Sequence, residues 1–320
     1  MRVALDDCDW VAMAAASDSV VFQSREWLEF LAQTQGAEPV VASVMRGDEQ
    51  VGWFTGAIVR RFGVRILGSP FAGWTTTWMG FNLDDGVDRW DACAALAPFA
   101  FGDLRCLHLE LRDRQLVTPA PPSLGWAQSE PDTYLVDLAV PEDEVFGRMS
   151  SACRRAVRKA EKSGVVVELA SGEDFAHEYY DQLRDVFAKQ SLEPTYGVDR
   201  VVQLIRHLEP AGSVLLLRAR SADGDSIATG IFPGGNGSAY FWGGASWRQH
   251  QGLRPNEAIF WHAMKCWKAR GATVLEMGGG GDYKLRYGPR EVTIPSFRRS
   301  RLPGMLALRD AAERVKRRGY

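Results

Sequence analysis

The chain has 320 residues, a mass of 35.5 kDa, 46% hydrophobic residues and 24% charged residues. This composition excludes a disordered or fibrous protein, and the length predicts two globular domains of about 150 residues each. No apolar run approaches the roughly 20 residues of a membrane helix. The opening segment MRVALDDCDW lacks the basic and then apolar layout of a secretory signal, so we expect a cytoplasmic protein. The five cysteines and five histidines show no ligand spacing, so no metal site is expected.

The charge is divided unevenly along the chain. Residues 1–145 hold 10 Arg, no Lys and 22 acidic residues, for a net charge of −12, whereas residues 146–320 hold 28 basic and 18 acidic residues, for a net charge of +10. This asymmetry predicts that the second half meets a polyanion, such as RNA or the phosphates of a coenzyme. The alternative is that the two halves attract each other.

In the first half, residues 23–35 have apolar side chains at helical spacing, which predicts an amphipathic helix. Residues 39–59 then indicate strand, turn and strand, and residues 89–111 a helix followed by a strand. Between these elements lies a segment rich in aromatic residues. We expect its aromatic side chains either to form one wall of a substrate pocket or to pack in the core, and the candidates are Phe71 and Trp74.

A domain boundary is predicted between residues 118 and 146. A Pro-rich turn, TPAPPSLGW, precedes a predicted strand, TYLVDLAV, and the acidic start of a helix, PEDEVFGRM. We therefore expect an N-terminal domain over residues 1–145 and a C-terminal domain over residues 146–320.

The segment from Arg148 to Lys162 is predicted to be a basic helix. Several of its cations are four positions apart and share one helical face. Such a stripe would neutralise RNA phosphates and would bind them less tightly as salt rises. A solvated helix of ordinary charge has the same pattern. The candidate phosphate-binding residues are Arg154, Arg155, Arg158 and Lys159.

The second half repeats the arrangement of the first. Residues 213–235 indicate strand, Asp-Gly turn and strand, and residues 256–279 indicate a helix that ends at Gly271 and a further strand. Two units of hairpin, helix and strand amount to a weak internal duplication. They predict an α/β (α+β) protein of mixed domains, each with a largely antiparallel sheet flanked by helices.

Between the second hairpin and its helix lies another β segment, residues 238–246, which is rich in aromatic residues. Strand alternation places Tyr240 and Trp242 on the opposite side from Phe241. One face is expected to belong to the core. The other face is a candidate lining for an acceptor or acyl pocket.

Four consecutive glycines, Gly278–Gly281, follow a predicted strand. They permit positive φ angles and close approach of a ligand, but they form no Walker loop because the Gly-Lys-Ser/Thr ending is missing. Their position directly before Lys284 favours a functional turn over a plain loop. Glu276 at the strand end and Asp282 beside Lys284 are candidate general bases for a substrate amine.

Several ordered motifs of the second half resemble the Fem-type branch of the GNAT acyltransferase superfamily: SSACRRAVRKAEKSGVVVEL, and the stretch from SAYFWGGASW to DYKLRYG. In the first half, FQSREWLEFL and ILGSPFAGW are similar to that branch more faintly. The resemblance implies tandem GNAT domains with the chemistry in the C-terminal one. It also implies formation of an amide (peptide) bond, often from aminoacyl-tRNA as a co-substrate and onto peptidoglycan precursors or small natural products, and no cofactor.

The family's Lys-x-x-aromatic-Gly element is similar to Lys284–Gly288 here. By that resemblance Lys284 stabilises the tetrahedral species of acyl transfer. A cation suits this role because amine attack on an ester builds negative charge on the carbonyl oxygen. Tyr283 and Tyr287 are expected to shape the same site. The alternative is a surface lysine after a Gly-rich turn.

Two positions depart from the Fem pattern. The lysine that is expected after Gln-Ser-x-x-Trp is replaced by Leu31, and the arginine that is expected in the helix after the basic segment is replaced at Lys189 or Gln190. Without these cations the phosphates of a nucleotide-linked peptidoglycan precursor have weaker partners. We therefore expect a different acceptor, a small molecule or a peptide that carries an amine.

GNAT proteins that use acetyl-CoA bind its pyrophosphate on a Gln/Arg-x-x-Gly-x-Gly/Ala turn at the start of a helix. Residues 249–254 match this turn except at the last small position, where the bulk of Arg254 obstructs backbone approach while its guanidinium offers a phosphate ligand. Gly252 and Arg254 are thus candidate phosphate-binding residues of an N-acyltransferase that depends on a coenzyme A thioester, the first alternative to an aminoacyl-tRNA donor. The second alternative is a non-catalytic protein that binds RNA or a cell-envelope partner.

Overall fold

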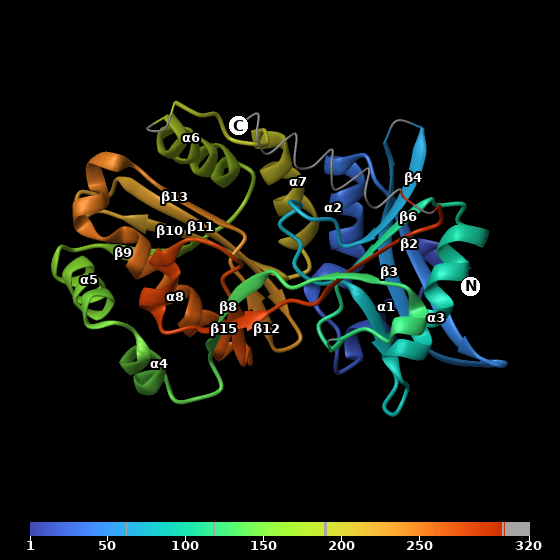
Figure 1. The fold of residues 1–320 in the computed structure, drawn as a ribbon. Helices are drawn as coiled ribbons and strands as arrows, with labels where there is room; N and C mark the ends of the chain where they lie inside the picture. The colour runs from blue at the N-terminus through green and yellow to red at the C-terminus, as the bar shows by residue number, and fades with distance from the viewer. Residues whose placement is uncertain (62, 118, 189–190, 303, 305–320) are drawn as a thin grey trace. The chain divides into compact units, whose positions relative to one another are not determined.

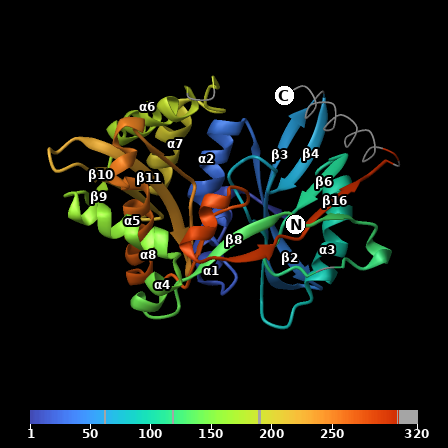
Figure 2. The same ribbon diagram turned by 60° about the vertical axis from the view of Figure 1, so that its left-hand side comes forward.

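The chain folds into two compact units, each a β-sheet flanked by helices (Figures 1 and 2). The structure, a computed structural model, describes residues 1–320 except 62, 118, 189–190, 303 and 305–320. Unit 1 consists of residues 1–131 and the chain from residue 294 onward, and unit 2 of residues 132–293. The predicted class is confirmed, because both sheets are mixed but largely antiparallel.

The sheet of unit 1 has eight strands in the order β1-β2-β3-β4-β6-β16-β7, and β5 pairs with β3 beside this path. Its pairs are antiparallel except for β4 with β6. The predicted hairpin of residues 39–59 is confirmed as β2 and β3. The strands are β1 (Arg2–Val3), β2 (Glu38–Arg46), β3 (Glu49–Arg61), β4 (Val64–Ser69), β5 (Gly80–Leu83), β6 (His108–Leu111), β7 (Ala127–Ser129) and β16 (Ser296–Ser300).

Unit 1 has helices α1 (Trp10–Ala15), α2 (Arg25–Gln35) and α3 (Arg89–Pro98). The predicted helix of residues 23–35 is confirmed as α2. It begins where the Ser24 hydroxyl accepts a hydrogen bond from the Trp27 amide at 3.2 Å, an N-cap that satisfies one free donor of the first turn. The apolar stripe of α2 is buried, as its spacing predicted, and α3 packs on the sheet over the core of unit 1.

The sheet of unit 2 also has eight strands, in the order β15-β8-β14-β12-β11-β10-β9, and β13 pairs with β11 beside this path. Among its described strands every pair is antiparallel except β12 with β14. The strands are β8 (Asp132–Asp137), β9 (Val166–Ala170), β10 (Val214–Arg220), β11 (Ser226–Gly235), β12 (Ser238–Tyr240), β13 (Gly243–Ser246), β14 (Val274–Glu276) and β15 (Arg290–Thr293).

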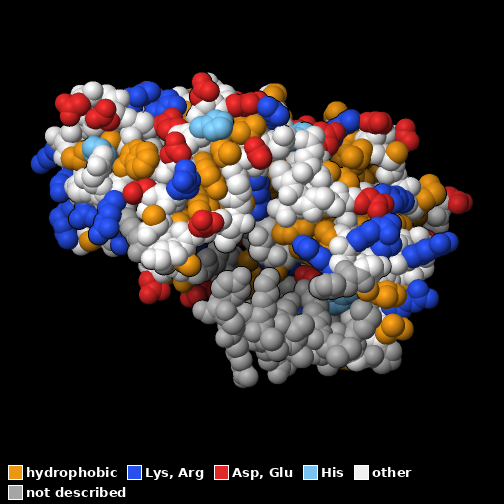
Figure 3. All heavy atoms as spheres, turned by 90° about the horizontal axis from the view of Figure 1, so that it is seen from above, with side chains coloured by type: hydrophobic (Ala, Val, Ile, Leu, Met, Phe, Trp, Pro, Cys, Tyr) orange, Lys and Arg blue, Asp and Glu red, His pale blue; other side chains and the backbone are white. Residues whose placement is uncertain are grey.

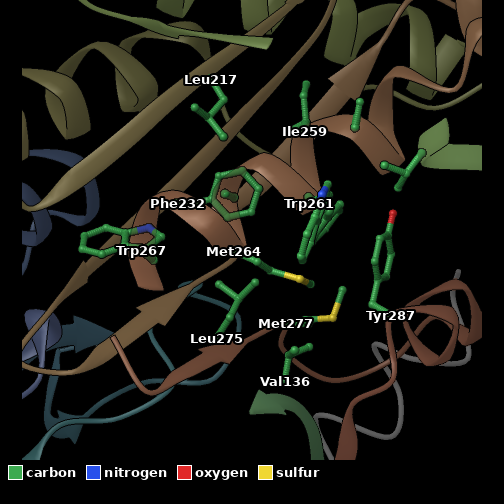
Figure 4. Close-up of a cluster of buried hydrophobic side chains, with 14 of the residues drawn as sticks. Val136, Leu217, Phe232, Ile259, Trp261, Met264, Trp267, Leu275, Met277 and Tyr287 are labelled. Atoms are coloured by element: carbon green, nitrogen blue, oxygen red, sulfur yellow. The ribbon is translucent and has the colours of Figure 1, made fainter. Parts of the chain in front are cut away.

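Helices cover both faces of the second sheet (Figure 1). On one face α8 packs against the sheet and α5 against α8, around a core to which the sheet contributes Phe232 and Leu275 (Figure 4). On the other face α6 packs against β11 and β13, and α7 packs against α6. The helices are α4 (Glu142–Arg148), α5 (Ser151–Lys162), α6 (Asp174–Ala188), α7 (Val198–Leu208) and α8 (Pro255–Ala269).

The two units do not divide at residue 145. The strand at Asp132–Asp137 pairs with β14 and β15, so the predicted break at 145/146 lies inside unit 2. At the other end, Ser296–Ser300 pairs with β6 and β7 and therefore belongs to unit 1. The reason is that long-range strand pairing, not the Pro-rich turn, decides where each strand is placed. No helix of the described chain is long and apolar enough to cross a membrane.

Candidate acyl-transfer site of unit 2

The parallel strands β12 and β14 separate at their carboxyl ends. They stay paired up to Tyr240 and Glu276, and the last bond runs from the Phe241 amide to the Glu276 carbonyl oxygen at 2.8 Å. Beyond this point β13 continues along β11, whereas the Met277 amide donates to the Tyr134 carbonyl oxygen at 2.8 Å. The end of a parallel pair where neighbouring strands part is a favourable place for a ligand.

Lys284 is buried directly after β14. It lies in a 3-10 helix, η6 (Asp282–Tyr287), and its side chain is only 7% exposed. Its Nζ donates hydrogen bonds to the carbonyl oxygens of Gly278 at 3.2 Å and of Gly279 at 2.9 Å. An ammonium has three N–H donors, so two of them fix its orientation against the glycine run.

The glycine run has to be glycine at several positions. Gly278, Gly280 and Gly281 have φ angles of 71°, 69° and 81°, which bulkier residues rarely adopt. At Gly279 the constraint is contact, because an added Cβ would lie 2.4 Å from the carbonyl oxygen of Asp132. The backbone can therefore curl closely around the Lys284 ammonium.

The pKa of Lys284 depends on its burial and on the Glu276 carboxylate. Burial lowers the pKa of Lys284, because the charged form is desolvated, and the nearby Glu276 carboxylate acts in the opposite direction. The Glu276 carboxylate is buried at 3% exposure and accepts a hydrogen bond from the Thr133 hydroxyl at 3.0 Å. Asp282, the other candidate base, is exposed at the start of η6.

The aromatic β segment divides between the two faces of the sheet as alternation predicted. Phe241 packs on the core side, with ring centroids 4.6 Å from Phe260 and 5.5 Å from Phe232. Trp242 packs on the other side, 5.4 Å from the ring of Tyr196. Tyr240 is 4% exposed and lies beside Glu276 in the ladder.

Sequence reasoning missed three residues that surround Trp242. The Tyr179 hydroxyl lies 2.8 Å from the Tyr196 hydroxyl, and the Arg200 guanidinium carbon lies 5.3 Å from the centre of the Tyr196 ring and 5.7 Å from that of Trp242. Burial lowers the pKa of Arg200. The indole Nε1 of Trp242 is buried without a hydrogen-bond partner among the described residues. We call Tyr179, Tyr196, Arg200 and Trp242 the aromatic–arginine cluster.

The two tyrosines of η6 have different environments. Tyr283 is 44% exposed, and the Nζ of Lys284 lies 5.9 Å from the centre of its ring. Tyr287 is 2% exposed and its ring lies 4.6 Å from that of Phe260, among the buried side chains of Figure 4. Tyr283 is thus accessible beside the ammonium, whereas Tyr287 is a core side chain that anchors η6.

The turn before α8 is poorly arranged for a pyrophosphate. Gly252 lies outside the positive-φ region, and an added Cβ would meet no atom within 4 Å, so the turn does not require glycine there. Arg254 adopts φ 63°, and Pro255 at the first helical position has no N–H to donate. In the first turn of α8 the buried carboxylate of Glu257 accepts from Arg286 at 3.0 Å and already places a negative charge at the positive end of the helix.

The basic helix is confirmed as α5, which begins at the Ser150 N-cap. Its cations have two roles. Arg154 donates to the carbonyl oxygens of Gly147 and Met149 at the end of α4, so its guanidinium caps that helix. The other candidates, Arg155, Arg158 and Lys159, are exposed, and no ion pair joins them to an acid within the described chain. Figure 3 shows Lys and Arg side chains gathered at the left-hand end of the surface.

The candidates of the first half lie in unit 1. The rings of Phe71 and Trp74 are 4.8 Å apart, and each side chain is 8% exposed. Gln23 of the Gln-Ser-x-x-Trp motif accepts from the Val20 amide at 2.9 Å, and Leu31 is 1% exposed in the core. Gln23 also accepts from the Asn82 amide at 3.0 Å, and the Trp27 indole donates to the Thr76 hydroxyl at 3.1 Å, so the motif fastens the start of α2 to residues 76–82. Lys189 and Gln190 lie outside the described residues.

Residues 147–287 match the family described as "Acetyltransferase (GNAT) domain". No curated protein matches the chain. The chain is similar to a solved structure of FemX, with a TM-score of 0.75 and 13% identity over 93% of this chain and 96% of that chain. It is also similar to L-PGS from Bacillus licheniformis, with a TM-score of 0.54 and 11% identity over 89% and 94% of the two chains.

A third similar structure is a tandem GNAT protein from the clavulanic acid biosynthesis pathway, with a TM-score of 0.52 and 12% identity over 95% of this chain and 98% of that chain. At such identities the likeness concerns the fold, and it extends over both units. Residues 147–287 are therefore a GNAT-type acyltransferase domain, and the chain has the fold seen in FemX and in the tandem GNAT protein.

Proposed function

We propose that the chain is an aminoacyl-tRNA-dependent aminoacyltransferase that forms an amide bond on the amine of a small molecule or peptide. The observation that carries this proposal is the buried ammonium of Lys284, oriented by two glycine carbonyls at the end of β14. A preorganised cation in a partly desolvated site stabilises a developing oxyanion strongly, because little reorganisation is needed when the charge appears.

The reaction balances without a cofactor. The acceptor nitrogen attacks the ester carbonyl carbon, a C–N bond forms, and the C–O bond to the terminal ribose of the tRNA breaks. The third N–H of Lys284 faces the oxyanion of the tetrahedral species. Glu276 takes the proton from the attacking nitrogen, and the ribose oxygen receives a proton as it leaves. The exposed Asp282 is the second choice for this base, because it reaches the same amine only from the solvent side.

Two features favour tRNA over coenzyme A as the donor. The first turn of α8 offers a proline and a buried carboxylate where a pyrophosphate needs free amides and positive potential. On α5, the exposed side chains of Arg155, Arg158 and Lys159 present positive charge to solvent, which suits an RNA backbone. Because charged tRNA is a cytoplasmic donor, the proposal also places the protein in the cytoplasm.

The acceptor pocket of this proposal is the sheet face that carries Tyr240 and Trp242. Tyr196 and Arg200 extend that face with a second ring and a cation beside Trp242. The buried Leu31 offers no charge to a nucleotide phosphate. These features support a compact amine acceptor rather than a nucleotide-linked precursor.

The test is to incubate the purified protein with a pool of charged tRNAs or with acetyl-CoA, each with candidate amines, across a salt series. The proposal expects deacylation of one aminoacyl-tRNA that depends on the amine and weakens as salt rises, and the loss of that reaction in Lys284→Met. Release of coenzyme A with indifference to tRNA would instead establish an acyl-CoA-dependent N-acyltransferase. Binding of RNA without consumption of either donor would indicate a non-catalytic protein.

A further inference from the structure

Unit 1 has two adjoining depressions that the proposed chemistry of unit 2 does not use. One is an apolar crevice of about 400 Å³ between α3 and strands β2, β3 and β5. The other is a wider basin of about 770 Å³. They share Met1, Phe99 and Asp103 in their linings, so they are continuous.

The basin is lined by four arginines, although residues 1–145 hold only 10 arginines against 22 acids. Arg2 and Arg65 are held by Glu38, at 2.7 Å and 3.2 Å. Arg60 and Arg105 are exposed, and no acid pairs with either of them within the described chain. The basin therefore presents unneutralised positive charge in a half that is otherwise strongly acidic.

The placement of these arginines is electrostatically unfavourable, because the single carboxylate of Glu38 serves both Arg2 and Arg65 and leaves Arg60 and Arg105 without a partner in the described chain. Arg60 lies directly opposite Arg65 in the β3–β4 ladder, and like charges in that position repel each other. Arg105 has a φ of 54°, a region that few residues other than glycine adopt, and such strain tends to persist where it serves a function. A bound phosphate would relieve the repulsion between the guanidinium groups.

The crevice is different in character. Its lining is dominated by apolar side chains such as Phe54, Phe81 and Leu96, which also belong to the core of unit 1, together with Val44 and Ala95 nearer the surface. Its volume lies within the range of about 300–1,000 Å³ that is typical of small-molecule sites. Met1 and Met45, which also line the crevice, are 78% and 44% exposed. Apolar surface left open to water is unfavourable, and a hydrocarbon chain would cover it.

We propose that unit 1 binds an anionic phospholipid at a membrane surface, with part of one acyl chain in the crevice and the phosphate in the arginine basin. The charge and the apolar lining lie side by side, as the two ends of such a lipid require. Neither depression involves Lys284 or the parting of β12 and β14. This binding would place the acyltransferase on a membrane surface, although no helix in the described part of the chain could span one.

The experiment measures co-sedimentation with vesicles of phosphatidylglycerol and phosphatidylcholine, and with phosphatidylcholine vesicles as the reference. We expect binding only to the anionic vesicles, weakened by salt. Each arginine near such a surface contributes about fivefold in affinity, so Arg60→Ser with Arg105→Ser should lower the affinity about 25-fold. The matched control is Arg46→Ser with Arg61→Ser, which removes the same charge from exposed positions outside the basin.

A second variant pair tests the crevice without a change of charge. Ala95→Trp fills the crevice, whereas Ala94→Trp adds the same ring at an exposed position of α3 outside the lining. Loss of vesicle binding in the first variant and not in the second supports an inserted chain. The proposal would be overturned if the two tryptophan variants bound anionic vesicles equally well. It would also be overturned if the two arginine pairs lost vesicle affinity to the same extent.

A further experiment distinguishes a membrane lipid from a soluble acyl thioester as the ligand. Tight binding of myristoyl-coenzyme A by a protein that ignores anionic vesicles would also overturn the proposal, because a soluble thioester would then be the ligand. The Lys284→Met variant should bind vesicles as the unchanged chain does. Failure of the acyl-transfer proposal and failure of the lipid proposal are therefore observed separately.

Discussion

The Nζ of Lys284 lies 2.9 Å from the carbonyl oxygen of Gly279, five residues earlier in the chain, and this bond orients a buried cation. Removal of the cation is the most direct test of the site. We expect Lys284→Met to lower kcat by about 10²- to 10³-fold, the usual cost of losing one oxyanion donor. Single-turnover kinetics with charged tRNA would measure the effect, and cooperative urea unfolding would show that the variant is folded. A variant with full turnover would exclude Lys284 from the chemistry.

The lowered pKa of Lys284 predicts a pH dependence. Only the protonated amine stabilises an oxyanion, so kcat should fall as pH rises through a pKa below the ordinary 10.5 of lysine. Deprotonation of the attacking amine has the opposite effect, because it raises kcat as pH rises. The direction of the change in kcat therefore distinguishes Lys284 from the substrate amine. In Lys284→Arg the guanidinium stays charged, so whatever turnover remains should lose this alkaline limb. If kcat of Lys284→Arg still falls at alkaline pH as in the unchanged chain, the fall belongs to another residue.

The same shift affects stability. Between the lowered pKa in the folded chain and the ordinary pKa in the unfolded chain, the unfolded chain holds the extra proton, so the free energy of unfolding should rise with pH across that window. Lys284→Met should remove this rise. Urea unfolding at several alkaline pH values would measure it, and parallel curves for the two proteins would contradict the prediction.

Gly279 tests whether the site depends on the curled backbone. An alanine there would bring its Cβ against the carbonyl oxygen of Asp132, so the backbone at residue 279 must shift. The shift would displace the Gly279 carbonyl oxygen that accepts a hydrogen bond from Lys284. We expect Gly279→Ala to destabilise the fold by about 1–3 kcal/mol and to lower turnover. At Gly235 an added Cβ meets nothing within 4 Å, so Gly235→Ala is the control and should leave turnover unchanged.

Much of the local structure could be predicted from the sequence, because it depends on patterns within a few residues. Helical spacing gave α2 and α5, and alternation put Phe241 and Trp242 on opposite faces, although it did not say which face is the core. The return of β16 to unit 1 could not be predicted in this way. Its partners β6 and β7 lie more than 160 residues earlier, and pairing at such separation leaves no local signal.

The site itself was only partly accessible to sequence reasoning. Motif resemblance led to Lys284, but no spacing joins Tyr196 and Arg200 to Trp242. The start of α7 and the segment between β12 and β13, which lie far apart in the chain, bring them together. Tyr287 shows the opposite problem. It lies three residues after the proposed catalytic residue Lys284, yet its ring packs on Phe260, and only burial distinguishes it from the exposed Tyr283.

The exposed face of α5 predicts a charge effect on RNA binding. Arg155→Ser with Lys159→Ser removes two cations that have no acidic partner in the described chain, so tRNA affinity should fall and the slope of log affinity against log salt should decrease by about 2. Arg184→Ser with Arg206→Ser removes the same charge from α6 and α7 and serves as the control. Equal losses in both pairs would indicate a diffuse effect of net charge.

The turn before α8 separates the two donors. If a coenzyme pyrophosphate lay on this turn, Gly252→Asp would place a carboxylate against it and abolish binding. If the donor is aminoacyl-tRNA, the side chain at this exposed position meets open space, so turnover should stay within about twofold and stability within about 0.5 kcal/mol. Gly252→Ser is the matched control, since it adds bulk without charge. A selective loss of acyl transfer in Gly252→Asp would therefore favour coenzyme A despite the Glu257 carboxylate, because repulsion from one added charge requires an anion on that turn.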